Sequence, residues 1–79
     1  MKDEILEFIN VQILKNRDSV DENRELLVSG VLDSLAVMNL VAFIEKSASR
    51  KIPPLDVTLE NFSTVASMVD YLERAPSGN

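Results

Sequence analysis

The spacing of apolar residues most constrains the fold, because it repeats with the period of an α-helix in separate segments of this 79-residue chain. In the first segment, from Lys2 to about Asn16, Ile5, Ile9 and Ile13 lie four residues apart and fall on one helical face. The strict alternation that is typical of a β-strand is weak throughout the chain. We therefore predict an all-α protein, and its length limits it to one domain.

A second helix is predicted from Asp33, a good N-cap residue, to about Ala48. Positions about 100° apart around the helix axis place a broad apolar set on one face, which we expect in the core. This set contains Ala36, Val37, Leu40, Phe43 and Ile44. A different face carries Leu35, Met38 and Ala42, together with Glu45. Folding does not require a row of exposed apolar residues, so this second face calls for a functional explanation.

The C-terminal third is predicted to contain a short helical turn and a last helix. Pro53 and Pro54 favour an extended connection, and the turn follows at residues 58–62. Ser63 is expected to cap the last helix, whose apolar face contains Val65, Met68, Val69 and Leu72. Three main helices and one short helix make a small four-helix bundle. We expect the domain to span residues 1–75 and residues 76–79 to form a flexible tail.

A long connection from Arg17 to Asp33 joins the first two main helices. Its apolar residues are expected to pack against the helices: Val20, Leu26, Leu27, Val28, Val31 and Leu32. Gly30 is free to adopt a positive φ angle before the second helix. The acidic residues between Asp18 and Glu25 lack the spacing of a calcium loop, so we expect them to form a solvated surface.

The composition excludes several classes of protein. Without cysteine or histidine, the chain has no disulfide, no thiolate or histidine metal site and no Ser-His-Asp triad. Its 13 acidic and 8 basic residues give a net charge of -5, which disfavours binding to nucleic acid. No apolar run approaches the roughly 20 residues of a membrane span, and the N-terminus lacks the pattern of a signal peptide. We therefore expect a cytoplasmic monomer that acts through protein partners.

The start of the second helix carries the most informative motif. A Gly-Val-Leu approach at residues 30–32 leads into Asp33-Ser34-Leu35, which resembles the Asp-Ser-Leu signature of acyl and peptidyl carrier proteins. Further similarities to that family follow along the chain, in Leu40-Val41-Ala42-Phe43-Ile44-Glu45, Ile52-Pro53, Leu59-Glu60-Asn61-Phe62, Thr64-Val65 and Tyr71-Leu72. The resemblance extends from about Glu4 to Glu73 and covers nearly the whole chain.

The resemblance implies that Ser34 receives a 4′-phosphopantetheine group from coenzyme A, with Asp33 and Leu35 as flanking motif residues. Free backbone N–H groups at a helix start tolerate the resulting phosphodiester well. The thiol of the group then holds an acyl or aminoacyl group as a thioester, so the chain needs no catalytic residue or metal ligand of its own. The implied partners are a phosphopantetheinyl transferase, an acyl- or aminoacyl-loading ligase, and a downstream transferase or synthase.

Two further sets of residues gain a role from the resemblance. Leu35, Met38, Ala42 and Glu45 align with the helix face on which the partner enzymes of the family dock. A second set forms either ordinary core or, in addition, a pocket for the acyl chain: Val37, Leu40, Val41, Ile44, Phe62, Val65 and Val69. Core packing alone accounts for these residues without any pocket.

Charge separates this chain from the carriers of bacterial fatty-acid synthesis, which usually have several acids after the serine. Here Ala36 and Asn39 occupy two of those positions, and Lys46, Arg50 and Lys51 add positive charge. Charge complementarity helps to select partners, so we expect a dedicated carrier in a specialised pathway. Free-standing aminoacyl carriers share the Val-Leu-Asp-Ser approach. Amino-acid, fatty-acyl and polyketide cargo all stay open.

The residues alone allow two alternatives to a carrier protein. A helical protein-interaction module without a covalent cofactor would use the same face with Leu35, Met38 and Ala42, but it would not need Ser34. A helix-turn-helix DNA-binding protein is disfavoured, because no candidate recognition helix is basic.

Overall fold

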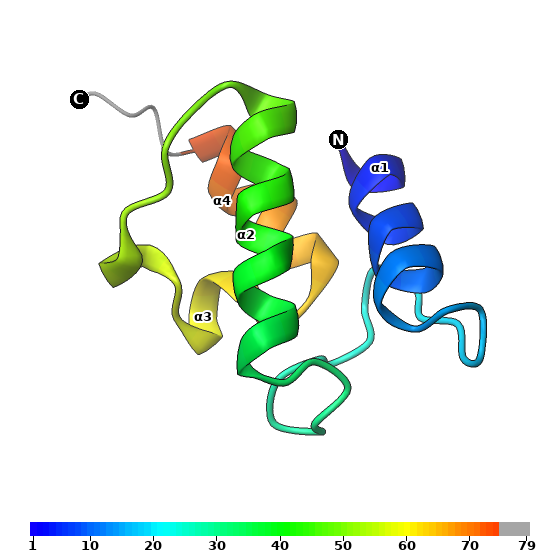
Figure 1. Ribbon diagram of the computed structural model, residues 1–79. Helices are drawn as coiled ribbons and strands as arrows, with labels where there is room; N and C mark the ends of the chain where they lie inside the picture. The colour runs from blue at the N-terminus through cyan, green and yellow to red at the C-terminus, as the bar shows by residue number, and fades with distance from the viewer. Residues whose placement is uncertain (75–79) are drawn as a thin grey trace.

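The computed structural model describes residues 1–74, so the tail expected at residues 76–79 lies outside the described part of the chain. Its elements are α1 (Lys2–Glu7), the π-helical segment η1 (Phe8–Ile13), α2 (Ser34–Ala48), the 3-10 turn η2 (Pro54–Asp56), α3 (Leu59–Phe62) and α4 (Val65–Arg74). Residues 1–74 contain no strand, which confirms the predicted all-α class. Figure 1 shows α2 running the length of the bundle, with α1 to one side and α4 behind it.

The first helix is shorter than predicted and changes its type midway. Leu14 N–H donates to the carbonyl of Ile9, five residues back, at 2.8 Å, as in a π-helix. Lys15 and Asn16 then adopt left-handed φ angles of 56° and 60°, which ends the helix before the expected boundary. Ile5 and Ile9 are buried, whereas Ile13 is half-buried, because a wider turn does not keep the four-residue spacing on one face.

The long connection is pinned to α1, η1 and the end of α3. Asn10 Oδ1 accepts a hydrogen bond from Val20 N–H at 2.9 Å, and Asn10 Nδ2 donates to the Val20 carbonyl at 3.3 Å. Further along, Leu26 N–H donates to the carbonyl of Ser63 at 2.7 Å. Val20, Leu26 and Leu32 are buried, as expected, and Leu27 and Val31 pack partly against the core. The connection is therefore an ordered part of the fold.

Val28 is the exception in this connection, since 77% of its surface is exposed although it was expected to pack inward. The backbone at residues 27–30 turns, with Gly30 N–H donating to the carbonyl of Leu27 at 3.1 Å. Gly30 has the anticipated positive φ angle of 82°. This turn directs Val28 outward just before the chain enters α2.

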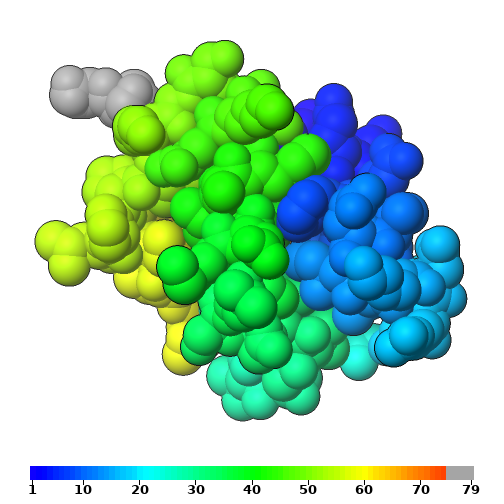
Figure 2. Space-filling view, viewed as in Figure 1, coloured from blue at the N-terminus to red at the C-terminus, as the bar shows by residue number. Residues whose placement is uncertain are grey.

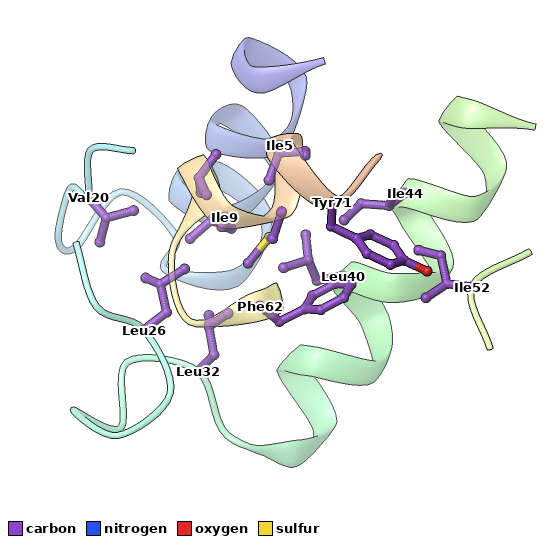
Figure 3. Packing of buried hydrophobic residues seen from close by; sticks show 12 residues of the cluster. Ile5, Ile9, Val20, Leu26, Leu32, Leu40, Ile44, Ile52, Phe62 and Tyr71 are labelled. Atoms are coloured by element: carbon purple, nitrogen blue, oxygen red, sulfur yellow. The ribbon is translucent and has the colours of Figure 1, made fainter. Parts of the chain in front are cut away.

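One hydrophobic core joins all the α-helices and the connection (Figure 3). It consists of Ile5, Ile9, Val20, Leu26, Leu32, Leu40, Ile44, Ile52, Phe62, Val65, Met68 and Tyr71. Of the residues predicted as core in α2, Leu40 and Ile44 are completely buried, whereas Ala36, Val37 and Phe43 are partly buried and pack against them. The Phe43 ring stacks on that of Phe8, with ring centroids 4.4 Å apart.

The start of α4 differs from the prediction. Thr64, rather than Ser63, caps the helix, because Thr64 Oγ1 accepts from Ser67 N–H at 3.0 Å and Ser67 Oγ accepts from Thr64 N–H at 3.2 Å. Ser63 instead ends α3, and its N–H donates to the Leu59 carbonyl. The buried face of α4 is formed by Val65, Met68 and Tyr71, while the predicted Val69 and Leu72 are half-buried. Tyr71 is a core residue that the sequence analysis missed.

The two faces of α2 differ in their contribution to stability. Leu40→Ala and Ile44→Ala should each lower the free energy of unfolding by about 2–5 kcal/mol, because both side chains are completely buried and truncation leaves a cavity. Leu35→Ala should cost well below that range, since 67% of Leu35 is exposed. Urea titrations of the three variants check this. Equal losses would contradict the orientation of α2.

Candidate functional site

The motif at residues 33–35 lies at the N-terminus of α2, and Ser34 is the first residue of the helix. Asp33 has an extended backbone and is the N-cap, as the sequence predicted. Its Oδ1 accepts a hydrogen bond from Ala36 N–H at 2.8 Å, and its carbonyl accepts from Val37 N–H at 2.9 Å. The side chain of Asp33 thus fixes where the helix begins and, with it, where Ser34 lies.

Ser34 is exposed, and its hydroxyl makes no hydrogen bond with any residue in the described part of the chain. The backbone N–H groups of Ser34 and Leu35 also have no acceptor within residues 1–74. Such N–H groups, aligned with the positive end of the helix dipole, favour a negative charge beside them. The start of α2 therefore combines an accessible hydroxyl with an environment suited to an anion.

Glu25 organises the turn that precedes this helix start. Its carboxylate accepts hydrogen bonds from the backbone N–H groups of Val28 and Ser29, both at 2.7 Å, and from that of Leu27 at 3.0 Å. These hydrogen bonds hold the pKa of Glu25 below its ordinary value, and the bond from Val28 N–H has the largest effect. Glu25 is partly exposed, and these hydrogen bonds give it a structural role beyond the solvated surface that was expected of it. Only the backbone geometry reveals this role, and no sequence pattern points to it.

The face of α2 that was expected to be exposed is largely so. Leu35 and Met38 are 67% and 68% exposed, and Ala42 is also exposed. Figure 2 shows α2 across the middle of one face of the molecule, with no other element covering it. Glu45 differs, because it is half-buried and its Oε2 accepts a hydrogen bond from Ile52 N–H at 2.8 Å. The exposed apolar stripe thus consists of Leu35, Met38 and Ala42.

An apolar groove of about 410 Å³ lies between α2 and residues 52–57. It is lined by Val37, Met38, Val41, Ala42, Glu45, Ile52, Pro54 and Val57. Two residues of the set expected as core or pocket, Val37 and Val41, therefore border this groove. Leu40, Ile44, Phe62 and Val65 are buried in the core, and Val69 packs partly against it.

The segment after α2, which forms the outer wall of the groove at residues 52–57, is fastened to α4 by polar contacts at Arg50 and Asp56. Tyr71 Oη donates a hydrogen bond to Asp56 Oδ2 at 2.6 Å, and Arg50 Nη1 donates to the Leu72 carbonyl at 2.9 Å. The Arg50 guanidinium also lies 5.6 Å from the centre of the Tyr71 ring. Burial, with the neighbouring Asp56, raises the pKa of Tyr71 above its ordinary value. These long-range contacts were not anticipated, because the partners lie 15 or more residues apart in the chain.

Comparison with known protein families places most of the chain in one family. The family model described as "Phosphopantetheine attachment site" matches residues 3–72 of the chain. No curated protein matches the sequence. The matched range covers most of the chain, with α2 and α3 whole and nearly all of α1 and α4, and it includes the exposed serine at the start of α2.

The N-terminus of α2 fits a covalently attached phosphopantetheine group. A phosphodiester on a serine needs an accessible hydroxyl, and that of Ser34 is exposed and makes no internal hydrogen bond within residues 1–74. Its negative charge would lie beside the free N–H groups of the first turn of α2. The carboxylate of Asp33 points its Oδ1 at Ala36 N–H instead, so that cap and phosphodiester use different N–H groups.

Glu25 makes the stability of the fold depend on pH. A carboxyl whose pKa is lowered by folding stabilises the native state above its ordinary pKa of 4.5, and this contribution is lost as the pH falls through the lower native value. Glu25→Gln should therefore be less stable than the wild type at pH 7, with a difference that shrinks below pH ~4.5. Urea titrations between pH 7 and 3 measure it. Glu73→Gln, at an exposed position of α4, is the control, and a gap for Glu25→Gln that persists at pH 3 would contradict this role.

Proposed function

Because this chain belongs to the phosphopantetheine attachment-site family, whose members bear covalent 4′-phosphopantetheine and act as carriers rather than catalysts, we propose that Ser34 is the attachment residue. The observation that carries this proposal is the position of Ser34 at the first turn of α2, exposed and directly after the N-cap Asp33. When bound, the group supplies a terminal thiol that holds an acyl or aminoacyl cargo as a thioester.

Ser34 acts as the nucleophile in its own modification. On a phosphopantetheinyl transferase with coenzyme A and Mg²⁺, Ser34 Oγ forms a bond to the phosphorus that carries pantetheine. The bond from that phosphorus to the adenosine bisphosphate breaks, and the hydroxyl proton passes to a base of the transferase. Asp33 keeps the helix start in place during this step, because its side chain is held by Ala36 N–H.

Intact-protein mass spectrometry tests the attachment site. The wild type, incubated with coenzyme A, Mg²⁺ and a promiscuous phosphopantetheinyl transferase, should gain the mass of one phosphopantetheine group. Ser34→Ala should gain none. Ser47→Ala should gain the group as the wild type does, because Ser47 is an exposed serine of the same helix but lies in its last turn.

Two results would contradict this proposal. An unmodified wild type, under conditions that modify a control carrier, would favour a helical interaction module without a covalent cofactor. A modified Ser34→Ala would assign the group to another residue.

The stripe of Leu35, Met38 and Ala42 is proposed as the surface on which the transferase and the loading enzymes dock. It begins beside Ser34 and continues along α2, so a partner resting on it has the attachment residue at its edge. Met38 is flexible and polarizable, which suits contact with several partners in turn. Its 68% exposure means that the fold itself does not use most of its surface.

Met38→Glu separates docking from folding. A charge in the middle of the stripe should slow loading of the chain by the transferase, and leave the far-UV circular dichroism spectrum and the urea midpoint nearly unchanged. Ser47→Glu places the same charge on an exposed position of α2 outside the stripe and should load at the wild-type rate. If both variants load equally fast, the stripe is not the docking surface of this enzyme.

We further propose that the chain is a dedicated carrier of acyl or aminoacyl groups in a specialised biosynthetic pathway. The support is the character of α2, which follows Ser34 with one acid only, Glu45. Of the two neutral residues noted after the serine, Asn39 is exposed and Ala36 is half-buried against the core. Enzymes that recognise a row of acids on this helix therefore find only Glu45, which is half-buried and accepts a hydrogen bond from Ile52 N–H.

A further inference from the structure

We propose that the exposed face of α2 is shaped for a partner surface that is apolar opposite Leu35 and Met38 and rich in carboxylates opposite Lys46 and Lys51. This inference rests on the proposed function, because it describes the partner that would dock beside Ser34. It goes beyond that function by stating the chemistry and the orientation of the partner.

The charges of α2 are the first support. The helix contains two charged residues, Glu45 and Lys46. Glu45 is half-buried, and its carboxylate accepts the N–H of Ile52. Lys46 is exposed, so it is the one fully exposed charge that α2 presents. The exposed face thus runs from apolar residues near its start to a positive charge in its last turn, in a chain whose net charge is -5.

The C-terminal turn of α2 brings Lys51 close to Lys46. Ser49, the C-cap of α2, has a left-handed φ angle of 54° and turns the chain back, so that Arg50 N–H donates to the Glu45 carbonyl at 3.1 Å. Lys46 and Lys51 then line one hollow of about 440 Å³, together with Ala42, Glu45, Ser49 and Arg50. Neither lysine forms an ion pair within residues 1–74.

The hollow adjoins the apolar groove, because Ala42 and Glu45 line both. A partner that fills the groove beside Met38 therefore extends directly over Lys46 and Lys51. Along the helix, Ser34 and Lys46 are about 18 Å apart at ~1.5 Å per residue. This spacing gives the partner surface a direction, with its apolar end near the attachment residue and its charged end away from it.

The remote acids of the chain do not cancel this local charge. They lie on other elements, among them α1, the connection before α2, and α4. At physiological ionic strength the Debye length is about 8 Å, so a carboxylate placed in the hollow responds mainly to the groups that line it. These are three basic residues, Lys46, Arg50 and Lys51, and one acid, Glu45, whose carboxylate accepts the N–H of Ile52. The net charge of -5 slows the approach of an acidic partner, whereas the local charge decides how such a partner is oriented.

A designed probe tests the proposal on the whole chain labelled with ¹⁵N. The probe is an amphipathic helical peptide with leucines along one face, glutamates clustered at one end and a nitroxide label at that end. At low salt it should shift amide resonances of α2 and of residues 50–52. The nitroxide should broaden residues 46–51 more strongly than residues 34–38, because the acidic end is expected over Lys46 and Lys51. A peptide with lysines in place of the glutamates should not give this pattern.

Charge reversal provides the matched control. Lys46→Glu with Lys51→Glu should weaken binding of the acidic peptide about tenfold at low salt, with a smaller effect at high salt. Arg17→Glu with Arg24→Glu changes the net charge equally, at exposed positions of the connection that form no ion pair in the described chain. This control should weaken binding less than twofold.

Binding away from α2, no shifts at low salt, equal weakening by the two double variants, or a reversed order of broadening would each overturn the inference. The mass test at Ser34 on the same samples separates this failure from that of the proposed function. If Ser34 is modified but the peptide test is negative, only the inference about the charge of the partner is contradicted. An unmodified Ser34 removes the carrier function whatever the peptide does.

Discussion

The fold depends on anchoring the long connection between η1 and α2, because this segment has no regular element of its own to hold it. Ordering so many residues costs conformational entropy, which burial of Val20, Leu26 and Leu32 must offset. Hydrogen bonds fix the path between these anchors, at Asn10 for the first part and at the Ser63 carbonyl for Leu26. The connection delivers the chain to the N-cap of α2, so the position of the exposed serine follows from contacts made far from it.

Helical spacing was enough to predict the three main helices, the N-cap Asp33 and the exposed stripe, since these features depend on neighbours within four residues. The features that were missed or misassigned depend either on a partner far along the chain, as for Tyr71, or on a local backbone path that apolar spacing does not encode, as for Glu25 and Thr64. Tyr71 is buried because its hydroxyl reaches Asp56, and Glu25 is held because the backbone after it curls around its carboxylate. The cap of α4 moved from Ser63 to Thr64 because only Thr64 can form the reciprocal pair with Ser67.

Helix α2 separates the requirements of stability from those of recognition. Its inner face contributes Leu40 and Ile44 to the core, and its outer face leaves Leu35 and Met38 uncovered. Exposed leucine and methionine add little to the stability of a small domain that buries a limited core. The fold therefore places few constraints on the outer face, and under the proposed docking role substitutions there would alter partner choice without unfolding the protein.

The absence of cysteine and histidine from the sequence gives the outer face its importance. Because members of this family obtain their reactive sulfur from the attached group, the chain itself supplies no thiol or imidazole to act on a cargo. Selection then rests on which enzymes bind the carrier, and hence on the shape and charge beside the attachment residue. On the proposed docking role, a face with apolar residues first and lysines last would discriminate by both attraction and repulsion, because a basic partner in the same orientation would meet Lys46 and Lys51.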